Sequence, residues 1–169
     1  MECMYSPQVR LNPIDEGTGY QIANVGSLLV TTHTQGATVA MVDKLEKILE
    51  AHQTKFGRFS VLAVVSGTGI RTPEAGLKER VVAQEKRFEK AIIGAAVCIE
   101  AKGLPAIFTR TFLVAYTLVS SHMFDLKIFG TIEASVDWLK SLPDQQNYFR
   151  ADLECAAEVR KLMGRSLAA

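Results

Sequence analysis

Residues 59–90 constrain the fold of this chain more than any other stretch of its sequence. A short apolar run at 60–65 ends in a glycine-containing segment, 66–69, and Thr72 then precedes a charged helical pattern over 73–90. An apolar run, a glycine loop and a capped helix predict a buried strand that leads through a loop into a helix N-terminus. Because α/β sheets place their sites at the carboxyl ends of parallel strands, we expect the functional site at this loop.

The composition of the chain limits the classes of protein to which it can belong. The chain has 169 residues, of which 48% are hydrophobic, and its 19 basic and 18 acidic residues leave a formal net charge of +1. This length and apolar content predict one domain with a sizeable core. The balanced charge and the absence of a basic run argue against a nucleic-acid partner.

The cysteines and the longest apolar segment give no sign of a metal site, a disulfide framework or a membrane span. The three cysteines, Cys3, Cys98 and Cys155, are far apart in the sequence, which argues against a metal site or a disulfide framework. The longest apolar segment, 104–119, is interrupted by polar residues and predicts no membrane span. We therefore expect a cytoplasmic protein with no cofactor and no metal.

Hydrophobic periodicity predicts the order of the elements along the chain. Strand patterns lie at 20–23, 27–34, 59–65, 92–99 and 124–129. Helical patterns lie between Thr38 and Gly57 and at 73–90, 105–121, 132–139 and 148–163, and all but the third of them are amphipathic. Strands joined through helices predict an α/β fold with a mixed, mostly parallel sheet of four to five strands. We divide the chain into an irregular arm (1–19), an α/β domain (20–142) and a C-terminal helical extension (143–169).

The predicted third helix, 105–121, is apolar on nearly all of its faces. Such a helix must be covered on nearly all faces, either by a second copy of the chain or by the C-terminal helix acting as a lid. Its large apolar residues are therefore candidates for self-association, namely Phe108, Phe112 and Tyr116.

Three parts of the sequence resemble the STAS family, named for sulfate transporters and anti-sigma factor antagonists. They are the strand at 27–34 followed by Gly36, the segment 66–68 before the second helix, and the closing stretch 127–139 with Trp138. The closing stretch resembles that of bacterial STAS-like proteins often grouped with CRAL-TRIO-type lipid-binding domains. The resemblance covers residues 20–142 and implies a regulatory module. Anti-sigma factor antagonists are phosphorylated on a Ser or Thr at the start of the second helix, after an Asp that this sequence lacks.

The segment before the second helix holds the candidate partner-binding or phospho-acceptor residues, which are Ser66, Gly67, Thr68, Arg71 and Thr72. A phosphate or another anion there would gain from backbone N–H groups and the helix dipole. The same residue types are also what loops and helix caps ordinarily use.

Three functional hypotheses follow. The first is a non-enzymatic regulatory or scaffolding module that works through protein–protein contacts, made by this segment and the second helix. The second is a protein that binds a lipid or other apolar ligand between the third helix and the sheet. The third is a small hydrolase that uses Ser66 or Cys98 as nucleophile with a histidine such as His33 as base.

Overall fold

The computed structural model describes residues 11–69, 74–100, 124–143 and 154–168. In these ranges it holds six strands and four helices. They are β1 (Asn12–Gly17), β2 (Tyr20–Val25), β3 (Leu28–Gln35), α1 (Val39–Phe56), β4 (Phe59–Gly69), α2 (Leu77–Phe88), β5 (Ile92–Ile99), β6 (Asp125–Phe129), α4 (Ile132–Ser141) and α5 (Glu154–Ala168).

The strands form one mixed sheet in the order β1-β2-β3-β4-β5-β6. β1 and β2, and β2 and β3, pair antiparallel, whereas the three pairings from β3 to β6 are parallel. The α/β class predicted from the sequence is confirmed. The predicted four to five strands are corrected to six. The sheet is mixed as predicted, but with three parallel and two antiparallel pairings it is less strongly parallel than expected.

The additional strand, β1, lies within the segment that the sequence analysis treated as an irregular arm. β1 turns into β2 through Thr18 and Gly19, whose φ of 79° suits a tight turn that only glycine enters without strain. Pro13 removes a backbone donor, which an edge strand tolerates because one side of its ladder is unpaired. Pro13 is therefore compatible with the pairing of β1 and β2. Hydrophobic periodicity alone did not predict this pairing.

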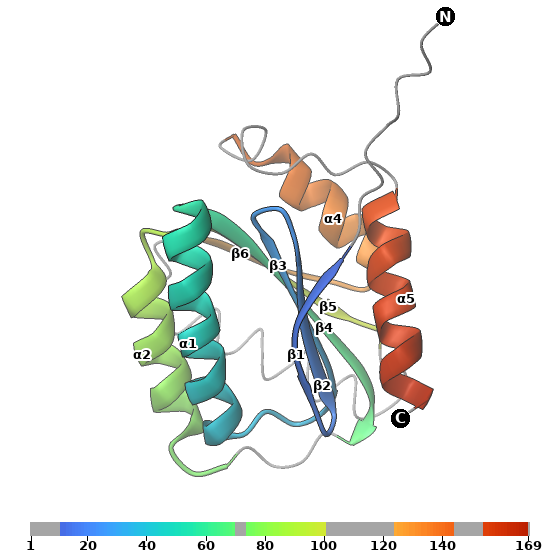
Figure 1. Ribbon diagram of the computed structural model, residues 1–169, viewed down its shortest axis with the longest axis horizontal. Helices are drawn as coiled ribbons and strands as arrows, with labels where there is room; N and C mark the ends of the chain where they lie inside the picture. The colour runs from blue at the N-terminus through green and yellow to red at the C-terminus, as the bar shows by residue number, and fades with distance from the viewer. Residues whose placement is uncertain (1–10, 70–73, 101–123, 144–153, 169) are drawn as a thin grey trace, which may run out of the picture.

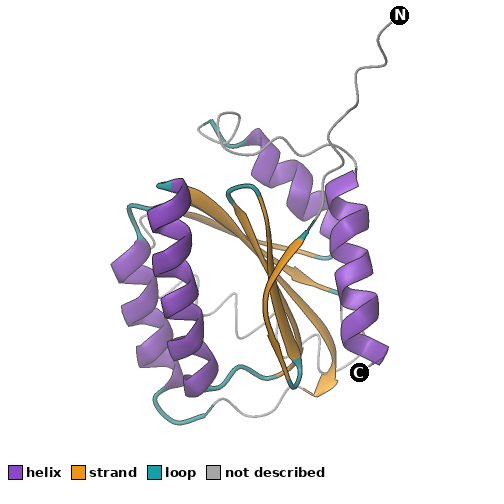
Figure 2. Cartoon of the chain, in the orientation of Figure 1, coloured by secondary structure: helices purple, strands orange, loops and turns teal. Residues whose placement is uncertain are grey.

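Two helical layers enclose the sheet, with α1 and α2 on one face and α4 and α5 on the other (Figures 1 and 2). On the first face, Leu49 of α1 and Phe88 of α2 pack in one buried cluster with residues of the sheet such as Leu29 and Phe59. On the second face, α4 and α5 bury their apolar stripes against β2 to β5; these stripes comprise Ile132, Val136, Leu139, Cys155, Ala156, Val159, Leu162 and Met163.

Local capping explains where α1 begins and ends. The side chain of Thr38 accepts a hydrogen bond from the backbone N–H of Met41 at 3.2 Å, and Gly57 closes the helix with a φ of 75°. Both boundaries confirm the sequence prediction. The C-terminal helix, predicted at 148–163, is observed as α5 in the described residues, and the predicted helix at 105–121 lies outside the described ranges.

Candidate functional site

The glycine-containing segment after residue 65 continues β4 and is not the loop that the sequence predicted. β4 runs to Gly69, which pairs with Gln35 of β3. The register shifts between His33 and Gln35, because His33 pairs with Val65 while Gln35 pairs with Gly69. β4 therefore carries a bulge at the carboxyl end of the parallel strands, and the extra residues are accommodated without ending the strand.

Gly67 makes this bulge possible. Its φ is 105°, a conformation that L side chains rarely adopt, and a Cβ built on it would lie 2.9 Å from the carbonyl oxygen of Thr34. Only glycine fits both the backbone conformation and the close approach of β3. The residue that looked like part of a loop is thus a structural requirement of a strand.

The predicted site residues are only partly brought together. Ser66 lies on β4 with its side chain buried, and Thr68 lies on the same strand. Arg71 and Thr72 lie outside the described residues, as do Phe108, Phe112 and Tyr116. Ser66 is 8% exposed and lies within β4, not at the start of a helix as the sequence predicted.

α2 begins four residues later than the sequence predicted. Its N-cap is Gly76, with a φ of 82°, and Leu77 is its first residue. Glu74 was expected in the first turn, but its Oε2 accepts a hydrogen bond at 2.8 Å from the backbone N–H of Val39, at the start of α1. Since a carboxylate is stabilised at a helix N-terminus, this contact holds residue 74 at α1 instead of inside α2.

The nucleophile and base pairs proposed from the sequence do not meet. His33 pairs with Val65, and consecutive strand residues face opposite sides, so His33 and Ser66 point to opposite faces of the sheet. Cys98 is buried among the residues under α4 and α5. Burial raises the pKa of its thiol to about 11, which opposes thiolate formation.

His33 itself is held in a neutral state. Its Nε2 lies 3.0 Å from the hydroxyl oxygen of Thr31, and its buried Nδ1 has no hydrogen-bond partner. Burial lowers the pKa of His33 to about 4, because the charged imidazolium would be poorly solvated there. The imidazole is therefore uncharged at neutral pH.

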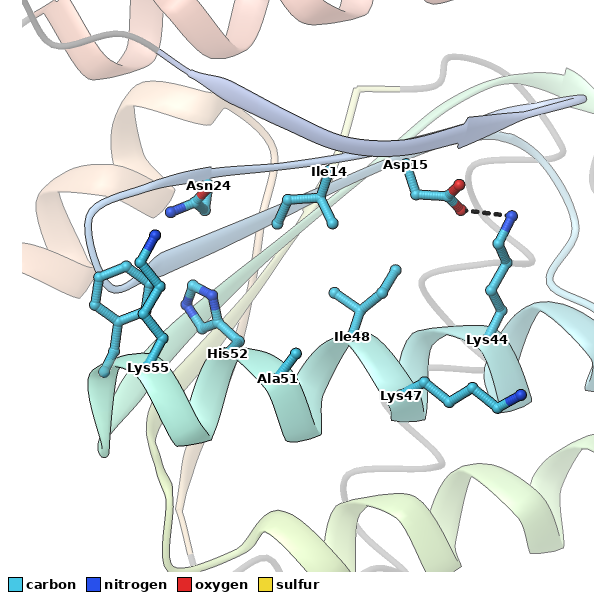
Figure 3. A pocket seen from close by; sticks show the side chains of 10 residues that line it. Ile14, Asp15, Asn24, Lys44, Lys47, Ile48, Ala51, His52 and Lys55 are labelled. Carbon is cyan, nitrogen blue, oxygen red and sulfur yellow. Dashed lines mark ion pairs between the residues drawn. The ribbon is translucent and has the colours of Figure 1, made fainter.

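A groove that the sequence analysis did not predict lies between the β1–β2 hairpin and α1. Its volume is about 430 Å³. Figure 3 shows Ile14 of β1 and Ile48 of α1 pointing toward one another across it. Its lining comprises Ile14, Asp15, Asn24, Lys44, Lys47, Ile48, Ala51, His52, Lys55 and Phe56. The groove thus combines apolar side chains with three lysines and a single carboxylate.

The polar side chains that line the groove differ in whether they have hydrogen-bond or ion-pair partners. Lys44 pairs with Asp15 at 2.7 Å and donates to the hydroxyl of Tyr20 at 2.8 Å. His52 donates from Nε2 to the carbonyl of Ser27 at 3.1 Å, and burial lowers its pKa. Lys47 and Lys55 also line the groove but have no carboxylate partner within the described part of the chain. The side chain of Lys47 extends along α1 (Figure 3), and the ammonium of Lys55 lies 5.1 Å from the centroid of the Phe56 ring.

The charged residues of α1 fall into two stripes that the sequence pattern merged into one solvent-exposed face. The acidic stripe faces α2: Asp43 accepts from Arg80 at 2.5 Å, while Glu46 accepts from both Arg80 and Arg87. The basic residues Lys44, Lys47 and Lys55 line the groove. Their positions along α1 were visible in the sequence, but nothing local indicated which element each group of charges would meet.

Comparison with known proteins identifies the fold. No family model matches the chain, and no curated protein matches it. A solved structure from Shewanella loihica PV-4 is similar, with a TM-score of 0.52 and 15% sequence identity, over 75% of this chain and 98% of that one. That protein is described as an uncharacterized member of the DUF3478 family with a SpoIIAA-like fold.

The chain therefore has a SpoIIAA-like fold, the fold of STAS domains, and the resemblance drawn from the sequence is confirmed at this level. No helix in the described ranges is long and apolar enough to cross a membrane. Among the same residues, no group of three or more histidine, cysteine, aspartate or glutamate side chains is arranged to hold a metal ion.

Proposed function

We propose that this protein is a non-enzymatic regulatory or scaffolding module that works through protein–protein contacts. The SpoIIAA-like fold supports this proposal, because it is the fold of STAS domains. The resemblance of the sequence to that family implies a module that regulates through protein contacts. The contact surface that we propose consists of the outer face of α2 together with the carboxyl end of β4.

The observation that carries this surface is the exposure of Val82 on α2. Its side chain is 39% exposed, and Ile14 is the other large apolar residue exposed to this degree among the described residues. Charged residues surround Val82 on the same helix, including Lys78, Glu79 and Lys86. An exposed apolar side chain within a polar rim is an arrangement found at protein–protein contact sites, and Val82 with its charged neighbours follows it.

Affinity purification with the full chain tests the proposal. We would compare proteins captured by the wild type, by Val82→Glu and by Ala157→Glu, whose position is exposed on α5 across the sheet. We expect Val82→Glu to lose partners that the wild type and Ala157→Glu retain, because a charge would replace the apolar contact. Identical partners for all three proteins would refute the α2 surface. Circular dichroism would establish that each variant is folded.

A further inference from the structure

We propose that the groove between β1 and α1 binds an acidic, extended peptide segment of a protein partner, with one apolar side chain of that segment seated between Ile14 and Ile48. This inference rests on the proposed function in one respect, namely that the chain acts through protein contacts. It concerns a different surface, on a different edge of the molecule, from the outer face of α2.

The apolar part of the groove provides an anchor point. Ile14 is 42% exposed, and it faces Ile48 across the groove, with Ala51 and Phe56 completing the apolar lining (Figure 3). The volume of about 430 Å³ falls within the range of sites that take one or a few side chains or a small ligand.

The charge of the groove selects an acidic occupant. Three lysines and one aspartate line it, although the whole chain carries a net charge of only +1. Lys44 is neutralised by Asp15, whereas Lys47 and Lys55 have no such partner in the described ranges. By contrast, Arg80 and Arg87 on the neighbouring helix are already paired with carboxylates of α1. The uncompensated positive charge of α1 is therefore concentrated at the groove, where it would attract carboxylates.

The spacing of the lysines favours an extended chain over a single compact anion. Lys47 and Lys55 are separated by eight positions on one helix, which corresponds to about 12 Å along its axis. An extended peptide covers this length with about four residues. Compact anions such as phosphate are usually bound by converging donors, an arginine fork or a nest of backbone N–H groups. Charges distributed along an apolar groove instead suit a segment that alternates carboxylates with an apolar residue.

Selection from a displayed library of random peptides tests the inference directly. The wild-type chain is the bait, and the double variant Lys47→Glu/Lys55→Glu is the counter-selection. We expect the retained peptides to share acidic residues around one large apolar residue. Retained peptides without acidic enrichment, or peptides that bind the double variant equally well, would overturn the inference.

Fluorescence anisotropy with the best selected peptide then locates the site. We expect the double variant to bind at least about tenfold more weakly, because two attractive charges become repulsive. Ile14→Ser should also weaken binding, whereas Lys78→Glu/Lys86→Glu, an equal change of charge on the exposed surface of α2, should leave it within about twofold. Binding should weaken as salt is raised from about 50 to about 200 mM, since the contacts are screened. Affinity that is unchanged in the groove variants would place the peptide elsewhere and refute the proposal.

Two further arms separate this inference from its alternatives. Sedimentation with vesicles that contain phosphatidylserine tests whether the lysines bind an anionic membrane. If the wild type binds these vesicles but no peptide, and the double variant loses the vesicle binding, the peptide assignment is overturned. Val82→Glu should keep the peptide affinity of the wild type. If Val82→Glu captures the same cellular partners as the wild type while the groove still binds its peptide, the α2 surface fails and the groove stands.

Discussion

Arg160 on α5 holds Glu133 in the first turn of α4 through two parallel hydrogen bonds, from Nε to Oε1 at 2.8 Å and from Nη2 to Oε2 at 2.7 Å. The remaining nitrogen, Nη1, lies 3.1 Å from Oε1 of Glu100, which directly follows β5. One guanidinium thus joins two helices and the end of a central strand. Its planar fork matches the carboxylate of Glu133, which a lysine ammonium does not do.

Removal of this guanidinium should loosen α5 from the sheet. We expect Arg160→Ala to lower the free energy of unfolding by about 1 kcal/mol, and Arg160→Lys to recover only part of it because the forked geometry is lost. Urea denaturation at neutral pH and low salt measures the effect. Lys161→Ala is the matched control, since Lys161 is more exposed than Arg160 and pairs with Glu158 of its own helix. Equal losses for Arg160→Ala and Lys161→Ala would contradict the bridging role.

Glu46 should contribute stability that depends on pH. It is buried to 8% exposure and accepts hydrogen bonds from Arg87 and Arg80, which lower its pKa below the ordinary 4.5. We expect Glu46→Gln to cost about 1–2 kcal/mol at neutral pH, because the arginines lose a charged partner. A carboxylate with a depressed pKa stabilises the fold fully above its unfolded value and loses this contribution as pH falls through the folded one.

Urea midpoints from pH 7 to pH 3 check this prediction. The difference between the wild type and Glu46→Gln should be constant down to about pH 5 and should shrink at lower pH. Glu79→Gln on α2 is the control, because Glu79 is exposed and pairs with no basic residue in the described ranges. A wild-type advantage that persists unchanged at pH 3 would show that the charge of Glu46 is not its source.

Two glycine substitutions should have effects of opposite sign. Gly67→Ala places a side chain in a left-handed conformation against the carbonyl of Thr34, so we expect a loss of about 1–2 kcal/mol. Gly164→Ala in α5 meets no atom within 4 Å, and we expect a gain of about 0.5–1 kcal/mol from its higher helix propensity. Thermal unfolding of both variants measures the contrast. A neutral Gly67→Ala would mean that the bulge in β4 relaxes without strain.

The elements that sequence reasoning predicted best are those specified by residues close together in the chain. Strands β3 and β5, the cap of α1 at Thr38 and the end of that helix at Gly57 follow from alternation, periodicity and capping within a few residues. Within β5, Gly94 allows a close approach, because Leu142 and Trp138 at the end of α4 contact the position that a Cβ would occupy. The resemblance to STAS domains rested on the same local order of strands and helices, and the fold confirms it.

The features that sequence reasoning missed depend on partners that are distant in the chain. The carboxylate of Glu46 meets Arg80 and Arg87 at separations of 34 and 41 residues, so the sequence pattern did not reveal which stripe of α1 would face α2. The bulge at Gly67 exists because Thr34 of the neighbouring strand approaches it. The groove needs Ile14 of an edge strand to lie opposite Ile48 of a helix.

The amino-acid sequence by itself determined the class of fold, because hydrogen bonding within helices and the alternation of strands are set by neighbouring residues. Only the tertiary structure decided where the charges of α1 are compensated and where they are left to face a groove. The physical reason is that the interaction energy of a charged side chain depends on the distance to its partner in space, which the order of residues along the chain does not specify.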